Sequence, residues 1–469
     1  MKMKKKILSA AVLAALGAGS AQAVNLSTDG TGEVLVFPYF TVQGNEETLL
    51  SIVNTTDEGK VVKVRFREAY NTQEVLDFHV YLSPYDVWVA KIQDSADGGA
   101  EVYTPDNSCT TMDDNPQQFF GRLFTDSGPT GAEREREGYF TAIEIARIVD
   151  MDLDGNGLQD YVHVNGVPDN CGAIRAAWLN GTMAANSTVD QPTGGLMGTL
   201  GIINVQSGTE VTVPATVLEN FLDSPQHVAP GSLRPDWQDA VPNSVVMTSD
   251  SANGTVSVYA DAWNTGEDAV SAVLMASALM NEYTVNPATE ASTAWIVTFP
   301  TKTLYVNGGA AVAPFTHTFA GDTDGDGKAC EEIGMTIYDR EEGQLSPDGS
   351  LVSPPPPTRT LSLCYEANVV QFGDSSDVFS AANTEIRFGD TALPGTSGWA
   401  KMTFNAPAHT MTSANGTVYN GLPVIGFKAT VLGNSNVGVG ASYAAAVNHA
   451  YERSIVGTPA YTVGGSAAN

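Results

Sequence analysis

The amino-acid sequence predicts a mainly β protein, built of antiparallel β-sandwich lobes with a few short helices. Short segments rich in β-branched and aromatic residues recur along the chain, and such residues favour strands. Clusters of Gly, Asn, Asp and Pro separate them, as expected for turns. In VVKVRFRE (61–68) apolar and cationic residues alternate, which predicts a strand with one face in solvent. The apolar positions are Val62, Val64 and Phe66, and the cationic positions are Lys63, Arg65 and Arg67.

Seven more segments have a strand-like composition, and two have apolar residues at the three- and four-residue intervals of a helix. The predicted strands are EVLVFPYFTV (33–42), TLLSIVN (48–54), EVLDFHVYLS (74–83), DVWVAKI (86–92), GTVSVYADAW (254–263), AWIVTFPTKTLYV (294–306) and VIGFKATVLG (424–433). The predicted helices are VPATVLENFLDS (213–224) and EDAVSAVLMASALM (267–280).

The length of 469 residues is enough for two or three lobes, each with its own core. We expect a signal peptide, an N-terminal sandwich-like region, two β-rich regions that each carry an acidic loop, and a C-terminal β region that begins with the Pro-rich crossing SPPPPTRT (353–360). The second β-rich region also holds a helix. The corresponding ranges are 1–23, 24–95, 96–225, 226–352 and 353–469.

The first 23 residues, MKMKKKILSAAVLAALGAGSAQA, have the pattern of a secretory signal peptide. Four lysines precede an apolar run, and Ala21-Gln22-Ala23 forms a small-residue cleavage site. The mature chain would begin at Val24. No later stretch approaches the roughly 20 apolar residues of a membrane helix, so we expect an exported protein without a membrane span.

The chain is strongly acidic, with 23 Lys and Arg against 53 Asp and Glu. Loss of four lysines with the signal peptide changes the balance to 19 − 53 = −34. Such a surface repels nucleic acid and anionic lipid. Because 42% of the residues are hydrophobic, the chain should nevertheless fold.

Four cysteines in an exported chain predict two disulfides, for which three pairings are possible. We favour Cys109–Cys171 and Cys330–Cys364, because each bridge closes a local loop that contains or adjoins an acidic motif. A thiolate metal site is the alternative, but the chain lacks CxxC spacing.

The segment DMDLDGNGLQDYVHV (150–164) spaces its oxygen-bearing residues as a calcium loop does. Oxygens at positions 1, 3 and 5 can face one cation, a glycine at position 6 allows the turn, and positions 7 and 9 complete the shell. The flanks are rich in β-branched and aromatic residues, so the loop should lie between strands. It is similar to the calcium loops of β-propeller repeats of the integrin FG-GAP kind. The predicted ligands are Asp152, Asp154, Asn156, the carbonyl of Leu158, and Asp160.

A second acidic segment, DTDGDGKACEE (322–332), resembles the DxDxDGxxCE signature of the Excalibur extracellular calcium-binding region. The matching positions are Asp322, Asp324, Asp326, Gly327, Cys330 and Glu331. The resemblance implies a second calcium loop, in which Lys328 offers its carbonyl and Glu331 or Glu332 completes the shell.

The sequence predicts no catalytic residue, and we expect a protein that is not an enzyme. HExxH, GxSxG and P-loop motifs are absent, and the six histidines are scattered. His163 follows the first acidic loop, where we expect a structural role. Six tryptophans and sixteen tyrosines could line a sugar site, although core packing is their commoner role.

Segments 36–92, 281–307 and 421–434 together resemble exported acidic proteins of proteobacteria, and in particular S-layer and biofilm-matrix proteins of marine gammaproteobacteria. The resemblance implies a β-rich protein on the outer surface of a Gram-negative bacterium that self-assembles with calcium, with an extracellular or periplasmic location. The alternative is a secreted adhesin or carbohydrate-binding module with calcium-ordered loops and cell-surface polysaccharide as its partner. A calcium-stabilised hydrolase is the third hypothesis.

Overall fold

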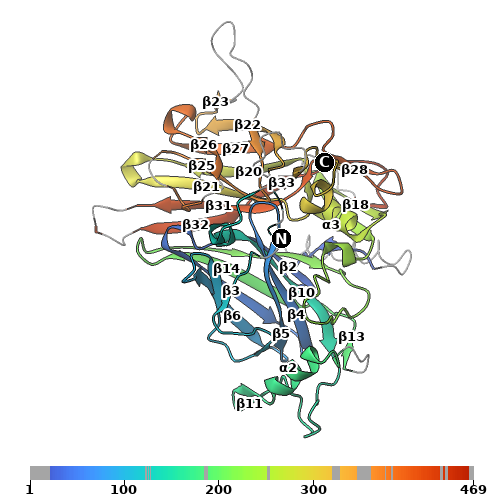
Figure 1. The fold of residues 1–469 in the computed structure, drawn as a ribbon. Helices are drawn as coiled ribbons and strands as arrows, with labels where there is room; N and C mark the ends of the chain where they lie inside the picture. Colours follow the sequence, from blue (N-terminus) through green and yellow to red (C-terminus); the bar gives the residue numbers. More distant parts are fainter. Residues whose placement is uncertain are drawn as a thin grey trace.

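A computed structural model describes residues 22–121, 124, 126, 128–183, 188–250, 254–319, 328–345, 361–374, 377–381, 384–433, 437–438 and 442–463. Almost all of the predicted signal peptide, the carboxylates Asp322, Asp324 and Asp326, and the Pro-rich stretch 353–360 lie outside these residues. The described part is mainly β, as predicted, and forms two lobes (Figure 1). Its three α-helices are α2 (Cys171–Leu179), α3 (Gly266–Leu274) and α4 (Thr303–Val306).

The N-terminal lobe is a sandwich of two sheets. Sheet 1 has eight strands, and sheet 2 has six. Sheet 1 runs in the order β1 (Asn25–Leu26), β16 (Thr216–Glu219), β2 (Val34–Thr41), β10 (Glu137–Ile148), β4 (Gly59–Glu68), β5 (Glu74–Leu82) and β8 (Cys109–Thr110), with β13 (Val189–Asp190) paired to β10. Sheet 2 runs in the order β15 (Thr209–Pro214), β14 (Leu196–Asn204), β3 (Glu46–Asn54), β6 (Val87–Asp94), β7 (Ala100–Tyr103) and β9 (Gln117–Gln118). Both sheets therefore take strands from residues 24–95 and from residues 96–225.

The C-terminal lobe contains two further sheets. Sheet 3 has five strands and sheet 4 has six. Sheet 3 runs in the order β26 (Thr384–Phe388), β25 (Ala367–Phe372), β21 (Ala291–Thr298), β31 (Ile425–Leu432) and β32 (Tyr443–Asn448). Sheet 4 runs in the order β23 (Gln344–Leu345), β22 (Glu331–Asp339), β27 (Ser397–Thr403), β20 (Ala278–Thr284) and β33 (Ala450–Glu452), with β24 (Leu361–Leu363) paired to β22.

Smaller elements complete the described fold. The small sheets are β11 (His163–Val164) with β12 (Val167–Pro168), β17 (Asn243–Asp250) with β18 (Thr255–Ala262) and β35 (Tyr461–Val463), β19 (Met275–Ala276) with β30 (Leu422–Pro423), and β28 (Thr410–Thr412) with β29 (Val418–Asn420) and β34 (Ser454–Val456). The short 3-10 helices are η1 (Gln43–Asn45), η2 (Ala132–Arg136), η3 (Trp237–Asp239), η4 (Pro287–Thr289) and η6 (Asp390–Ala392). No helix in the described ranges is long and apolar enough to cross a membrane.

Two hydrophobic cores join the lobes, because sheets 1 and 3 are buried on both faces. Along β2, Phe37 packs into the core shared with sheet 2, whereas Val36 packs into the other core. Along β21, Ile296 packs into the same core as Phe37, and Trp295 packs with Val36 and sheet 4. Strands buried on both faces need apolar residues at successive positions, which matches the VLVF run of β2.

The predicted solvent-exposed face of segment 61–68 is wrong. Every residue of β4 is buried, because the later segment 224–240 passes over its cationic side. The ammonium of Lys63 donates to the carbonyls of Ser232 and Arg234 at 2.6 and 3.1 Å. Asp236 forms ion pairs with both neighbouring guanidiniums, 3.2 Å from Arg65 and 2.6 Å from Arg67, and accepts a hydrogen bond from Arg67. The alternation thus marks a buried ionic layer.

The helix predicted at 213–224 is also wrong, since this segment forms the end of β15 and all of β16. Its final turn is held by Glu33, whose carboxylate accepts from the backbone N–H groups of Phe221 and Leu222 at 2.6 and 3.1 Å. The helix predicted at 267–280 is correct only for its first half. α3 ends at Leu274, and the chain continues into β19 and β20.

Both favoured disulfides are formed. Cys109 is bonded to Cys171, and Cys330 is bonded to Cys364. The first bridge joins β8 to the start of α2, and the second joins the residue before β22 to the residue after β24. Both bridges therefore constrain the chain near the predicted acidic loops.

Candidate metal centre

The first acidic loop connects β10 to the β11–β12 hairpin, so it lies between strands as predicted. Gln159 closes its base, because its side-chain oxygen accepts from Met151 N at 2.6 Å and its nitrogen donates to Asp150 at 2.9 Å. The backbone at Gly155 and Gly157 has φ of 78° and 86°, a conformation that favours glycine. The glycine expected at the sharp turn is therefore required there.

Asp152 shapes this turn. One carboxylate oxygen accepts from the N–H groups of Gly155 and Asn156 at 2.8 and 3.0 Å, and the other accepts from Gly157 N at 2.9 Å. Both oxygens are thus occupied by the loop backbone. Leu158, predicted to offer its carbonyl, lies on the exposed side of the loop with its side chain in solvent.

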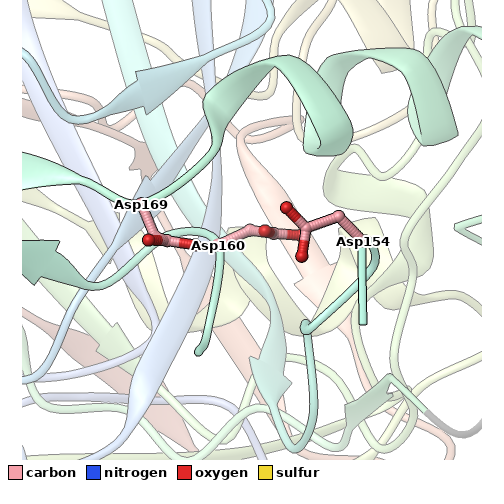
Figure 2. Close-up of side chains that lie close together, drawn as sticks. All are labelled: Asp154, Asp160 and Asp169. Carbon is pink, nitrogen blue, oxygen red and sulfur yellow. The ribbon is translucent and has the colours of Figure 1, made fainter. Parts of the chain in front are cut away.

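Three carboxylates of this region converge, as Figure 2 shows. Asp154, Asp160 and Asp169 each place one oxygen within 4.8 Å of the others. Two of them belong to the predicted ligand set, and Asp169 does not. The structure therefore brings together part of the predicted site and adds one residue that sequence reasoning missed.

Asp160 is the buried member of the cluster, with 0% of its surface exposed. Its Oδ2 accepts from Leu153 N at 2.9 Å, but its Oδ1 is buried without a hydrogen-bond partner. Burial raises the pKa of this carboxyl, and the charges of the neighbouring aspartates raise it further. A buried carboxylate oxygen without a donor is costly unless a cation or proton satisfies it.

Two amide side chains bridge the cluster. Asn156 donates from Nδ2 to Asp169 at 2.7 Å, and Asn170 donates to Asp154 at 2.8 Å. Asn170 also caps helix α2, since its Oδ1 accepts from Ala173 N at 3.0 Å. Asn156 turns its nitrogen toward the carboxylates, while its Oδ1 accepts from Leu158 N at 2.8 Å. A half rotation of the amide would present the oxygen to a cation, as expected for the ligand at position 5, at the cost of that hydrogen bond.

A hairpin brings Asp169 to the loop. Asn165 and Gly166 both have positive φ, 55° and 84°, as the two central residues of a type I′ turn require. This turn pairs β11 with β12, and Asp169 N then donates to Val162 O at 3.2 Å. The Asn-Gly dipeptide is the sequence signal that could have located Asp169, because it predicts that the chain reverses and returns to the loop.

The disulfide Cys109–Cys171 holds the same region in place. Cys171 begins α2, two residues after Asp169, and Cys109 Sγ lies 3.9 Å from the carbonyl oxygen of Asp160. Asn170 N donates to that carbonyl at 2.9 Å. The disulfide and these backbone contacts thus hold the cluster between β8, the acidic loop and the start of α2. They do so although its three aspartates lie outside regular strands and helices.

The donor set consists of oxygens alone. Three carboxylates and one rotatable amide match the hard ligands that calcium prefers, whereas zinc and copper favour nitrogen and sulfur. Close carboxylates repel one another, and a divalent cation would relieve both this repulsion and the desolvation of Asp160. The cluster is therefore suited to a hard divalent cation such as Ca²⁺ or Mg²⁺.

The second predicted loop can be described only from Lys328 onward. Glu331 is fully buried and accepts from Thr316 N at 2.8 Å, Thr316 Oγ1 at 2.6 Å and His409 Nε2 at 3.0 Å. Burial alone would raise its pKa, but these hydrogen bonds outweigh it and lower the pKa of the carboxyl. Glu332 is exposed on the opposite side of β22. The carboxylate of Glu331 is therefore already stabilised by protein donors, and the calcium role predicted for this segment stays a prediction.

His163 contacts Ser83 Oγ at 3.0 Å and Asn107 Oδ1 at 3.1 Å, contacts that fit the structural role expected for it.

Neither a scan of protein-family models nor a search of the curated proteins gives a match to this chain.

Proposed function

We propose that the chain is an exported calcium-binding structural protein of the cell surface, a surface-layer or biofilm-matrix component that self-assembles with calcium. The observation that carries the proposal is the buried Oδ1 of Asp160, which has no hydrogen-bond partner and belongs to a carboxylate that is clustered with two others. Calcium bound there would connect the loop, the hairpin and the start of α2. The proposal assigns no catalytic role.

The two disulfides support export, because such bonds persist in oxidising compartments. The acidic composition supports a role for calcium in assembly, since copies of the mature chain, with a net charge of 19 − 53 = −34, repel one another until cations screen or bridge their carboxylates. Extracellular calcium sites bind with dissociation constants of about 0.1–1 mM.

Titration calorimetry tests the calcium site. We expect a dissociation constant of about 0.1–1 mM and, at about 10 mM calcium, an increase of roughly 1.4–2.7 kcal/mol in the free energy of unfolding. Asp160→Asn keeps an oxygen for Leu153 N but loses the charge, so it should lower the binding stoichiometry by one. Asp169→Asn should weaken the same site. Asp114→Asn, on an exposed residue away from the cluster, is the matched control. Unchanged binding in Asp160→Asn would refute the site.

Light scattering tests assembly. As calcium rises from chelator to about 10 mM, the protein should form large particles that dissolve when chelator is added back. If the centre described above contributes, Asp160→Asn should need more calcium for the same scattering. A protein that binds calcium and remains monomeric throughout would keep the site but contradict the structural role.

A further inference from the structure

The outer face of sheet 4 carries an open cleft of about 740 Å³ in the C-terminal lobe. Its floor is formed by β20, β22 and β27, and one wall is the turn between β22 and β23. In Figure 1 these strands lie in the upper lobe, whereas α2 and β11 of the metal centre lie at the lower end. The cleft is therefore a separate site.

An exposed aromatic pair lies in this cleft. Trp399 and Tyr338 are cross-strand neighbours, and their rings stack with centroids 4.4 Å apart and an interplanar angle of 10°. Trp399 is 42% exposed, whereas four of the other five tryptophans are buried and Trp178 is half-buried. A stacked pair that keeps a tryptophan in solvent gives a flat apolar surface with restricted side-chain motion.

Hydrogen-bonding groups flank the aromatic pair. Glu282 lies opposite Trp399 on β20, and its carboxylate is held by the ammonium of Lys428 at 2.9 Å. On the other side, Asp339 Oδ1 accepts from Glu341 N at 2.9 Å and from Gly343 N at 2.7 Å. These bonds fix the turn that carries two exposed residues of the cleft wall, Arg340 and Glu342.

We propose that this cleft binds a neutral polysaccharide. The C–H face of a sugar ring would stack on Trp399, and its hydroxyl groups would donate to the carboxylates of Glu282 and Glu342, with Arg340 donating to a ring or hydroxyl oxygen. This combination of a flat apolar surface with a few convergent polar groups is typical of ligand sites. The activity goes beyond the proposed structural role and would attach the protein to surface or matrix glycan.

The charge of the cleft selects the ligand class. The lining holds three carboxylates, Glu282, Asp339 and Glu342, and one guanidinium, that of Arg340. The ammonium of Lys428 pairs with Glu282, so the cleft carries a surplus of one negative charge. Polysaccharides that carry carboxylate or sulfate groups would be repelled by this surplus. Uncharged hexose chains have hydroxyl donors for the carboxylates and meet no such repulsion.

Affinity electrophoresis and calorimetry with laminarin, dextran and cellohexaose test the proposal, with alginate as the acidic comparison. At least one neutral glycan should bind the full chain and quench its tryptophan fluorescence. Trp399→Ala should weaken that binding about tenfold, because loss of a stacking contact has this order of effect. Glu282→Gln and Glu342→Gln should weaken it as well.

The control is Tyr443→Ala on β32, which removes an exposed aromatic residue outside the cleft and should bind as the parent does. Asp160→Asn should also bind normally, so failure of the calcium proposal and failure of this one are distinguishable. Absence of binding to all three neutral glycans would overturn the proposal. Binding that survives Trp399→Ala, or alginate binding that depends on Trp399, would overturn it too.

Discussion

Replacing Asp236 by alanine should lower the free energy of unfolding by about 2–3 kcal/mol, since two largely buried guanidiniums lose a charged partner that is itself 30% exposed, and Arg65 keeps Glu74 at 2.6 Å. Asp236 is the shared anion of two guanidiniums, since its oxygens lie 3.2 Å from Arg65 and 2.6 Å from Arg67. The side chains of these arginines are 2% and 3% exposed. Without Asp236, Arg67 would retain the neutral hydroxyl of Thr141 as an acceptor.

Asp236 also starts the short helix η3. Its carboxylate accepts from Trp237 N at 2.8 Å, and Trp237 Nε1 donates to the carbonyl of Pro300 at 2.8 Å. The Asp236 side chain therefore fixes segment 224–240 on sheet 1. It also positions Trp237 for its hydrogen bond to Pro300, which follows strand β21. Loss of the cap adds to the loss of the ion pairs.

Chemical denaturation at pH 7 measures the effect. Asp236→Asn keeps an acceptor for Trp237 N, so it should lose less stability than Asp236→Ala. Asp223→Ala, on an exposed residue immediately before segment 224–240, should change stability by less than about 0.5 kcal/mol. Equal stabilities for Asp236→Ala and Asp223→Ala would mean that Asp236 contributes nothing to the buried ionic layer.

The same layer shows what the sequence could predict of the fold. The alternation in segment 61–68 correctly predicts a strand and its two faces, because side-chain direction follows from local backbone geometry. It records that Lys63, Arg65 and Arg67 need polar surroundings, but not whether water supplies them. Here the backbone carbonyl groups of residues 232–234 supply part of these polar surroundings. Because every residue has such a carbonyl group, the sequence gives no sign of this contact. The covering segment has no recognisable pattern of its own.

The two helix predictions differ in outcome for a related reason. Segment 267–280 is preceded by Thr265, whose side chain accepts from Asp268 N at 3.4 Å, and the acidic residues Glu267 and Asp268 lie in the first turn. These local signals favour α3. In segment 213–224 the apolar spacing arises by coincidence, and pairing of β16 with β1 and β2 determines the structure. Strand pairing between residues so far apart leaves no periodic signal.

The candidate site was predictable where its geometry is local. Asp154 and Asp160 belong to one spaced motif, and the φ of Gly157 agrees with the expected turn. Asp169, nine residues after Asp160, reaches the cluster only because the β11–β12 hairpin reverses the chain. Asp152 was assigned as a ligand, yet both of its oxygens accept from backbone N–H groups. Spacing gives the residues that can reach a cation, whereas the folded loop and hairpin show which carboxylate oxygens are already engaged by protein donors.

The stability of the protein should fall as the pH rises from about 4.5 to about 8, in part because of Glu366. This carboxyl is fully buried at the start of β25, and neither of its oxygens has a hydrogen-bond partner. Its backbone N donates to Ala69 O at 3.0 Å, and its carbonyl accepts from Phe299 N at 2.8 Å, so it lies between the lobes. Burial raises its pKa from 4.5 to about 8.

The direction of this pH dependence follows from the two pKa values of Glu366, 4.5 in the unfolded chain and about 8 in the folded protein. The folded protein holds the proton of Glu366 more tightly than the unfolded chain does, so below pH 4.5 both states are protonated and the fold bears no cost. Above pH 4.5 the unfolded chain ionises first, and its free energy falls relative to that of the folded state. The loss is complete once the pH has passed about 8, and it amounts to on the order of 3–5 kcal/mol.

Denaturation of Glu366→Gln across pH 5–9, with chelator present, isolates this residue. The amide cannot ionise, so the variant should lose less stability with pH and should exceed the parent most at pH 9. Glu332→Gln makes the same change of charge on an exposed position of β22 and should follow the parent. Parallel pH profiles for the parent and Glu366→Gln would mean that the buried carboxyl is ionised at no cost. A difference in stability between the two proteins that is confined to high pH would instead show that the contact between the lobes weakens under alkaline conditions, independently of calcium.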